Sequence, residues 1–426
     1  MMLGILFAIF LVFLFMGMPV AYAMSISAVV TLFFDNSLPG LIIPQKMFTA
    51  MDSFSLMAIP FFMLAGSLME QCGITKKLVG FARSVVGHFT GGLGHATIVT
   101  GVLMAGVSGS ANADTVAIAS ILVPALKDEG YDAGYSCALV SGCGALGPII
   151  PPSIMMVIYS GVTSIAIGAL FMAGFLPGIL TALGYMVVNF LYAKRAGIKR
   201  TKFVGWKKLA KDTVQAIPAL IMPLIIIGGI LSGVVTATES GVLACTYSII
   251  YGFCCHTINV PKLKRCIMDA VSATTNSMII IAFAGLFGML VTNYNMSKVI
   301  LGITTALTSS PTVVLIFVSV ILFVAGMFID SNAAMLMLIP IFAPLIGQYG
   351  FHPLHFAMVC ILTLDMGGMS PPVGLLMYLA ANVTDTPLGK VVKNIWQFIV
   401  VNYGVTILVI LIPAIVMWLP GLAGLI

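Results

Sequence analysis

The sequence predicts an all-α, polytopic membrane protein built from two repeats whose helices are broken inside the membrane. Three observations support this fold class. First, 60% of the 426 residues are hydrophobic and 8% are charged, whereas soluble domains average about 25% charged residues. Second, two Pro-Pro segments, residues 147–153 and 367–374, interrupt long apolar runs. Third, the segments around the two Pro-Pro pairs share the same spacing of glycine and proline.

Apolar runs and polar turns divide the chain into roughly ten to twelve predicted spans and several re-entrant pieces. The first run, residues 1–34, is predicted to be one helix kinked at Pro19, and a polar connector over residues 35–53 follows it. The 43 glycines and 21 prolines fit broken, closely packed membrane helices. The later runs cover residues 54–70, 95–126, 133–192, 213–236, 240–256, 270–294, 298–329, 332–385 and 395–420.

One short stretch holds much of the positive charge, since residues 194–211 contain eight of the 19 lysines and arginines. By the positive-inside rule this stretch is a cytoplasmic loop, as is a second basic cluster at residues 262–265. The net charge of +6 is therefore a sign of membrane topology and not of nucleic-acid binding. The loop predicts the domain organisation: repeat 1 over residues 1–193, a cytoplasmic linker over residues 194–212, and repeat 2 over residues 213–426.

Each Pro-Pro pair predicts a break in a membrane helix. Proline lacks the backbone N–H donor and restricts the residue before it, so a helix cannot continue through residues 151–152 or 371–372. Inside hydrocarbon, the freed backbone groups are tolerated only within protein or beside a water-filled cavity. We therefore expect both breaks to lie near the middle of the molecule and to build its binding site.

The repeat aligns residues 106–152 with residues 326–372 without a gap. Nine of the 47 aligned pairs are identical, and six of the nine are glycine or proline. These two residue types fix the backbone, so their identity indicates a shared architecture more strongly than matched aliphatic residues would. Paired breaks at corresponding positions of two halves point to the binding site of a secondary transporter. A basic segment with Lys76, Lys77 and Arg83 aligns with one that holds only Lys298, which favours inverted repeats.

Polar side chains beside the first break are typical of a Na⁺ site. Ser108, Ser110 and Asn112 occupy every second position around a glycine-rich tip. Their oxygen atoms can converge with the backbone carbonyls of residues 144–148, and hard oxygen ligands suit such a cation. In the alternative interpretation, these side chains pack helices and bond neighbouring backbone groups. Equivalent clusters beside both breaks favour binding of an ion or a substrate.

Asp330 is the most informative residue of the second cluster. It lies in an apolar stretch, next to Ser331 and Asn332 and opposite residues 363–369. A carboxylate inside the membrane is costly and usually functional. Its counterpart in the first repeat is Ser110.

Ser153 follows the first Pro-Pro pair at a predicted helix start, where it is either an anion ligand or an ordinary N-cap. Three further acids, Asp114, Glu239 and Asp365, are predicted to lie inside the membrane. Glu239 is either functional or a helix cap with Thr236, and Asp365 is expected to help to hold the second break.

Features of an enzyme or an ATP-driven pump are missing from the sequence. The five histidines lack the spacing of a metal site, and the chain contains no P-loop. Neither catalysis nor ATP hydrolysis is therefore expected.

Five motifs spread along the chain identify a family. They are residues 59–66 (IPFFMLAG), 106–114 (GVSGSANAD), 147–153 (GPIIPPS), 236–240 (TATES) and 369–374 (MSPPVG). Together they resemble the large membrane subunit of TRAP (tripartite ATP-independent periplasmic) transporters, over essentially the whole chain, and the sialic-acid branch is the most similar. The sequence departs from the family at Ala237, where proline often precedes the Thr-Glu pair, and this leaves the local bend open.

The resemblance implies an elevator-type, Na⁺-coupled importer with two inverted repeats, two re-entrant hairpins, a static scaffold and a mobile transport domain. It implies an inner-membrane complex with a small four-helix membrane subunit and a periplasmic substrate-binding protein, without an ATPase and without a cofactor besides the coupling Na⁺. The expected cargo is a carboxylate-bearing organic acid, with N-acetylneuraminate first and a C4-dicarboxylate second.

The resemblance also assigns roles by motif. Ser110, Ser153 and Asp330 are expected to face the substrate. One Na⁺ site is expected from Ser108, Ser110, Asn112, Gly144, Gly147 and Pro148, and another from Asp330, Asn332, Thr363, Gly367 and Met369.

Three rival functions stay open: a stand-alone ion-coupled anion transporter, an integral membrane enzyme and a channel.

Overall fold

The computed structural model describes residues 1–35 and 38–426, and within these ranges every regular element is a helix, as predicted. Residues 36 and 37 of the predicted connector lie outside the described part. Of the helices in the described ranges, six are long and apolar enough to cross a membrane. Several other predicted spans are divided by breaks into shorter apolar helices, among them Gly92–Ser108, Ser331–Phe342 and Pro353–Gly368. The six are Phe54–Gln71, Ile167–Arg195, Trp206–Leu231, Val260–Asn293, Pro311–Phe328 and Leu388–Leu411.

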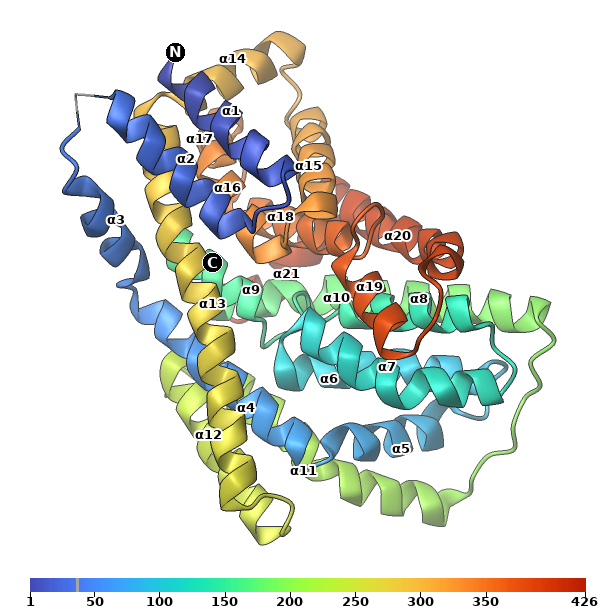
Figure 1. Ribbon diagram of the computed structural model, residues 1–426. Helices are drawn as coiled ribbons and strands as arrows, with labels where there is room; N and C mark the ends of the chain where they lie inside the picture. The colour runs from blue at the N-terminus through green and yellow to red at the C-terminus, as the bar shows by residue number, and fades with distance from the viewer. Residues whose placement is uncertain (36–37) are drawn as a thin grey trace.

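The chain folds into the helices labelled in Figure 1. The first half forms α1 (Met2–Phe15), α2 (Val20–Phe34), α3 (Ile42–Met51), η1 (Phe54–Met57), α4 (Ala58–Gln71), α5 (Ile74–Val86), α6 (Gly92–Ser108), α7 (Ala111–Asp128), α8 (Ala133–Gly144), α9 (Ile154–Thr163) and α10 (Ile167–Arg195). The second half forms α11 (Trp206–Leu231), α12 (Ala237–Cys254), α13 (Val260–Asn293), α14 (Met296–Leu307), α15 (Pro311–Phe328), α16 (Ser331–Phe342), α17 (Pro344–Tyr349), α18 (Pro353–Gly368), α19 (Leu375–Val383), α20 (Leu388–Leu411) and α21 (Ala414–Leu422).

The first apolar run differs from its prediction, because residues 1–34 form two helices instead of one kinked helix. Gly17 between them has a φ of +82°, a left-handed conformation that glycine adopts without a steric penalty. Pro19 follows and offers no backbone donor. The chain therefore turns at this point, and α2 packs against α1.

The last predicted span also has different bounds. The helix begins at Leu388, before the predicted residue 395, and ends at Leu411, two residues before Pro413. The remaining apolar residues form the separate helix α21. Proline near a helix end is the physical reason for this division.

The helix boundaries repeat with the spacing that the sequence alignment predicts. Helices α7 and α16 begin at residues 111 and 331, and α8 and α18 begin at residues 133 and 353. Each pair is 220 residues apart, the same separation as the two Pro-Pro pairs. Helices α9 and α19, and α10 and α20, follow the same order with a shift of one residue. The two segments therefore share one helical plan.

Contacts between the two copies are reciprocal. Helix α7 of the first packs against α19 of the second, and α16 of the second packs against α9 of the first. In the same way α8 contacts α20, and α18 contacts α10. Exchanged contacts of this kind relate two copies by a two-fold axis, a relation that inverted and parallel repeats share.

The irregular segment between the two halves is shorter than the predicted linker over residues 194–212. Helix α10 extends to Arg195 and α11 begins at Trp206, so ten residues join them.

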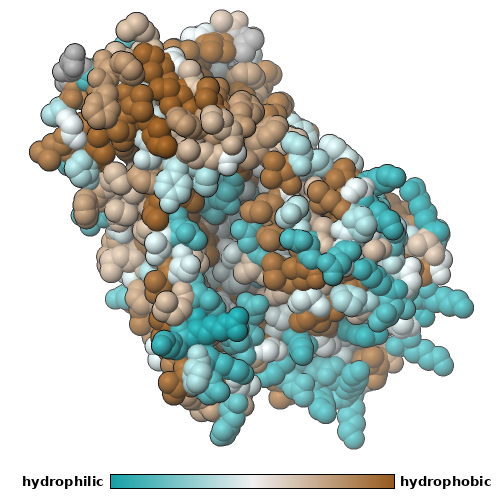
Figure 2. All heavy atoms as spheres, in the orientation of Figure 1, coloured by the Kyte–Doolittle hydropathy of each residue, from teal (hydrophilic) through white to brown (hydrophobic). Residues whose placement is uncertain are grey.

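Figure 2 shows hydrophobic side chains gathered over α1, α2, α14 and α15, and hydrophilic side chains over the opposite edge near α5 and the start of α11. The charge of the chain is thus concentrated away from the apolar helices.

Candidate functional site

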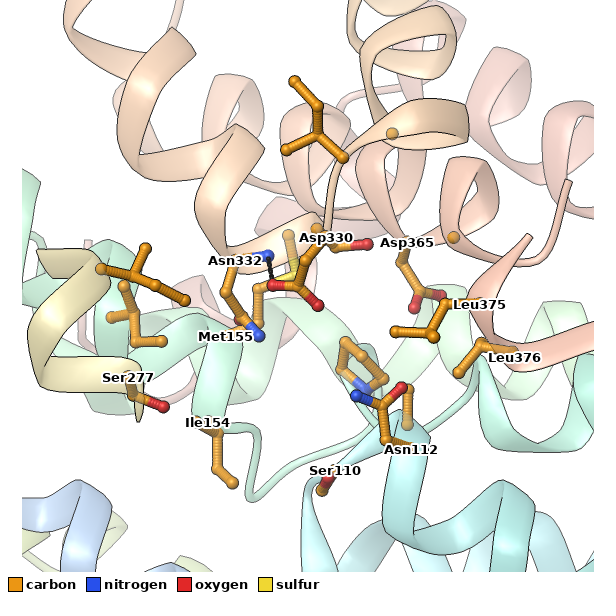
Figure 3. A pocket seen from close by; sticks show the side chains of 18 of the residues that line it. Ser110, Asn112, Ile154, Met155, Ser277, Asp330, Asn332, Asp365, Leu375 and Leu376 are labelled. Atoms are coloured by element: carbon orange, nitrogen blue, oxygen red, sulfur yellow. Dashed lines mark hydrogen bonds between the residues drawn. The ribbon is translucent and has the colours of Figure 1, made fainter. Parts of the chain in front are cut away.

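Four helix breaks surround one central cavity of about 560 Å³. Two are the turns between α6 and α7 and between α15 and α16, and two are the Pro-Pro segments that precede α9 and α19. Figure 3 shows side chains from both repeats around this cavity, among them Ser110, Asn112, Asp330 and Asn332. Residues more than 200 positions apart in the sequence thus share one wall.

The α6–α7 turn depends on a glycine. Gly109 has a φ of +61° and ends α6. A Cβ atom at this position would lie 2.3 Å from the carbonyl oxygen of Pro152, so no other residue allows this approach. The first turn and the first Pro-Pro segment are therefore in direct backbone contact. The next residue, Ser110, caps α7 by accepting a bond from the amide of Ala113 at 3.5 Å.

The α15–α16 turn uses a carboxylate as its cap. Asp330 Oδ1 accepts bonds from the amides of Asn332 at 3.0 Å and Ala333 at 3.4 Å. Ser331 Oγ donates to the carbonyl of Leu364 at 3.0 Å and joins this turn to α18. The start of α16 thus holds Asp330 at the cavity wall, where the helix N-terminus favours a negative charge.

The predicted ligands of the first Na⁺ site lie together around the start of α7. Ser110, Asn112 and Pro148 line the central cavity, and Ser108 lines an adjoining one. Gly147 packs closely on α7, since a Cβ atom there would lie 3.0 Å from the amide nitrogen of Ala111. Gly144 also contacts α7, where its Cβ would meet the side chain of Thr115 at 1.8 Å and the carbonyl of Ala111 at 3.0 Å.

The predicted ligands of the second site divide into two groups. Asp330 and Asn332 line the cavity, whereas Thr363, Gly367 and Met369 are buried at the end of α18. The Thr363 hydroxyl donates to the carbonyl of Val359 at 2.6 Å, so its backbone carbonyl is the group left for a ligand role. At the end of α18 the carbonyl of Gly367 accepts a bond from the amide of Ser370 at 2.9 Å.

Ser153 does not line the central cavity. Its side chain is fully buried, donates to the carbonyl of Pro148 at 2.7 Å and accepts a bond from the amide of Met156 at 3.2 Å. The structure therefore places it as the N-cap of α9. A contact between Ser153 and substrate stays a prediction.

Two of the additional acids belong to the neighbourhood of the site, although sequence reasoning gave neither a place in an ion site. Asp114 is fully buried, and its Oδ1 accepts a bond from Ser108 Oγ at 2.6 Å. Its Oδ2 has no hydrogen-bond partner in the described part of the chain and lies against Gly147. Asp365 lines the central cavity. The sequence feature that could have placed Asp114 in the ion site is its position one helical turn after Ser110.

Glu239 takes the capping role that was one of its two interpretations. The Thr236 amide donates to Glu239 Oε2 at 2.7 Å, and the Glu239 amide donates to Thr236 Oγ1 at 3.3 Å. This reciprocal pair begins α12. Ala237, where the sequence departs from the family motif, is the first residue of that helix.

The titratable side chains that line the central cavity are all acids. Among the described residues that line it, Asp330 and Asp365 are acids and none is basic. The remaining polar groups are amides and hydroxyls, including those of Asn112, Asn276 and Ser277. Such a wall offers ligands to cations and repels a free anion.

A second cavity of about 320 Å³ continues from the first. Both are lined by Ser110 and Ile154, so they share a wall. The second cavity reaches Asp114 at its inner end and the exposed acids Glu70 and Asp269 elsewhere on its wall. A path lined by acidic side chains therefore leads from the surface to the first loop tip.

Comparisons with known proteins identify the family of the chain. The profile of the family "Tripartite ATP-independent periplasmic transporter, DctM component" matches residues 7–415. The sialic acid TRAP transporter large permease protein SiaM of Vibrio cholerae is 32% identical over 96% of this chain and 96% of its own length. The C4-dicarboxylate TRAP transporter large permease protein DctM of Pseudomonas aeruginosa is 33% identical over 93% and 92%. The isethionate TRAP transporter permease protein DctMQ of Oleidesulfovibrio alaskensis is 33% identical. That match covers 98% of this chain but 66% of the length of that protein.

Solved structures share the fold at low sequence identity. The YdaH transporter of Alcanivorax borkumensis superposes with a TM-score of 0.60 at 14% identity, covering 86% of this chain and 87% of that one. Neisseria gonorrhoeae MtrF superposes with a TM-score of 0.59 at 13% identity, covering 89% and 84%. The relatives are transporter permeases and not enzymes. The chain therefore belongs to the DctM family, the large permease component of TRAP transporters, and is a multi-pass membrane protein.

Proposed function

We propose that the chain moves a carboxylate-bearing organic acid into the cell together with Na⁺, by an elevator motion of the domain that carries the loop tips. One observation carries this proposal: the central cavity between the repeats is lined by two carboxylates and by no basic side chain among its described residues. An organic anion needs positive charge in such a place. Bound cations are the available source.

The repulsion between an organic anion and the acids of the cavity is large enough to make bound cations necessary for anion binding. At an effective dielectric constant of about 20, two like unit charges about 5 Å apart repel each other by about 3 kcal/mol. That energy corresponds to a more than 100-fold loss of affinity. An anion would therefore bind weakly until cations neutralise the acids, and this ordering couples the two solutes.

The first Na⁺ would bind at the start of α7. Ser108, Ser110, Asn112 and the carbonyls of residues 144–148 would hold it. Asp114 adds the charged ligand that this set lacks, because its Oδ2 is buried beside Gly147 without a hydrogen bond in the described structure. A buried carboxylate oxygen requires such a partner.

The second Na⁺ would bind at the start of α16. Asp330 supplies the charge, and Asn332 with the carbonyls of Thr363, Gly367 and Met369 supplies neutral oxygen ligands. Only one carboxylate oxygen of Asp330 is used by the two backbone amides, so the other is available. Ser110 and Asp330 would face the substrate between the two ions.

Family membership supports a proposal for the partners and the location. We propose an inner-membrane complex with a small four-helix subunit and a periplasmic substrate-binding protein, without an ATPase. Repeat 1 over residues 1–193 and repeat 2 over residues 213–426 would each contribute scaffold helices and one hairpin, joined by the cytoplasmic linker over residues 194–212. A stand-alone carrier is the rival, and uptake without any binding protein would favour it.

N-acetylneuraminate is the first acid to test and a C4-dicarboxylate the second. The relatives that handle sialic acid, C4-dicarboxylates and isethionate are 32–33% identical to this chain. Identity therefore does not separate them, and a panel of acids must include all three classes.

The test is uptake into proteoliposomes that contain the permease and the small subunit, with the binding protein outside. We expect uptake only under an inward Na⁺ gradient, and we expect Asp330→Ala and Ser110→Ala to abolish it while the variants still fold. Equal uptake with K⁺ or H⁺ in place of Na⁺ would refute the coupling. Near-normal uptake by both variants would refute the site.

A further inference from the structure

Three buried polar side chains lie where α10, α18 and α20 pack together, and one of them, Asp365, also lines the central cavity. They are Tyr185 on α10, Asp365 on α18 and Asn402 on α20, and they are 0%, 1% and 3% exposed. Within the described residues, the Tyr185 hydroxyl, Asp365 Oδ2 and Asn402 Oδ1 have no hydrogen-bond partner. Buried polar atoms of native proteins nearly always have one.

The three side chains belong to one junction. Helices α10, α18 and α20 pack against one another in all three combinations. The Tyr185 ring lies 5.2 Å from Phe398, which is one helical turn before Asn402. Finally, Asn402 Nδ2 donates to Met369 Sδ at 3.9 Å, one turn after Asp365.

The other repeat provides an internal comparison for this junction. Helices α8 and α18 are 220 residues apart and α10 and α20 are 221 apart, so the counterparts of Asp365, Asn402 and Tyr185 are Ala145, Thr181 and Thr406. All three are 0% exposed, so the equivalent junction is equally buried but has two hydroxyls and no carboxylate. The fold therefore does not need a carboxylate here, and Asp365 requires another explanation.

The charge of an ionised Asp365 fits a bound cation. In the described ranges the one ion pair between protein side chains is that of Arg83 with Glu129, so Asp365 has no basic partner. A buried carboxylate is tolerated when it is paired or coordinates a metal ion. One carboxylate oxygen beside an amide oxygen and a hydroxyl is a suitable set of hard ligands for a small cation.

We propose that Asp365, Asn402 and Tyr185 form a third cation site, which takes a monovalent cation. The choice of Na⁺ as that cation rests on the proposed function. Because Asn402 contacts Met369, the ion holds the loop whose carbonyls bind the second Na⁺. Occupancy of the third site thus prepares the second, and repeat 1 has no equivalent site because its junction lacks a carboxylate.

The experiment counts ions bound to the purified full chain in detergent, with radioactive ²²Na⁺ and no substrate. We expect Asp365→Ala to bind one Na⁺ fewer than the wild type at saturation. We also expect its unfolding temperature in K⁺ to be no lower than that of the wild type, because Ala is the residue of repeat 1 at this position. An unchanged count in Asp365→Ala would overturn the proposal and assign the cluster to bound water or a neutral acid.

A second variant covers the case in which Asp365→Ala fails to fold. Tyr185→Phe removes only a hydroxyl, and we expect it to lower the affinity for one of the bound Na⁺ ions about tenfold. Tyr159→Phe is the matched control, since it removes another fully buried hydroxyl without a partner in the described structure. Equal Na⁺ affinity in both Phe variants would overturn the third site. A wild type that binds no Na⁺ would instead overturn the proposed function, so the two failures are distinct.

Discussion

The α6–α7 turn of repeat 1 and the α15–α16 turn of repeat 2 occupy equivalent positions but carry their charge differently. In repeat 1 the cap is the neutral Ser110, and the carboxylate of Asp114 follows one turn later, bonded to Ser108. In repeat 2 the carboxylate of Asp330 is itself the cap, and the position equivalent to Asp114 is Ala334. Each loop tip thus has one acid, but only Asp330 faces the shared cavity.

This difference separates what the fold requires from what transport requires. The repeat preserves the helix boundaries and the Pro-Pro breaks, because these set the backbone path. It does not preserve the position of the acids. We infer that the two ion sites have unequal roles, with the first buried beside a path to the surface and the second next to the substrate.

The largest expected effect is on Asp330. We expect Asp330→Ser, which introduces the residue of repeat 1, to lower Na⁺-driven uptake more than about 100-fold, because the second site loses its charged ligand. Serine is also a good N-cap, so α16 should still form. The measurement is initial uptake in proteoliposomes at matched protein content.

Two further variants make this result specific. Asp128→Ser removes an exposed acid at the end of α7 and should leave uptake unchanged. The exchange Ser110→Asp with Asp330→Ser should not restore uptake, because the new carboxylate would lie one turn from Asp114. Restored uptake would mean that the two loop tips are interchangeable.

Gly109 tests the shape of the first tip rather than its charge. We expect Gly109→Ala to destabilise the protein by about 3 kcal/mol or more, because it combines a left-handed backbone with a contact of 2.3 Å to Pro152. Gly130→Ala is the control, since Gly130 has a φ of +92° but open space around it. Equal losses of thermal stability in the two variants would show that the left-handed backbone alone determines the loss. The contact between the α6–α7 turn and the first Pro-Pro segment would then not contribute to stability.

Asp114→Asn should have a smaller effect than Asp330→Ser. The amide keeps the size of the side chain but removes the charge, so we expect Na⁺ to bind about tenfold more weakly at the first site. The concentration of Na⁺ that gives half-maximal uptake measures this change. The control is Asp128→Asn, which should behave as the wild type. An unchanged Na⁺ dependence in Asp114→Asn would remove this residue from the first site.

Backbone features were predictable from the sequence, and side-chain partnerships mostly were not. Glycine and proline act locally, so the two breaks and the repeat followed from spacing alone. The role of Asp114 depends on Gly147, 33 residues away, which hydropathy cannot place beside it. The junction of Tyr185, Asp365 and Asn402 needs three helices to be packed before its residues meet. The turn at Gly17 was mistaken for a kink because apolar composition alone cannot tell a broken helix from a reversed one.

The smallest effect is expected at Ser153, whose counterpart in repeat 2 is Val373. The Ser153 hydroxyl is occupied by the carbonyl of Pro148 and the amide of Met156. We expect Ser153→Ala to lose about 1 kcal/mol of stability, the usual cost of an N-cap, with an unchanged KM for the acid. Thermal unfolding and concentration-dependent uptake measure the two quantities separately. A raised KM at normal stability would instead make Ser153 a substrate ligand, and the first repeat would then contribute two hydroxyls to the anion where the second contributes a carboxylate and a valine.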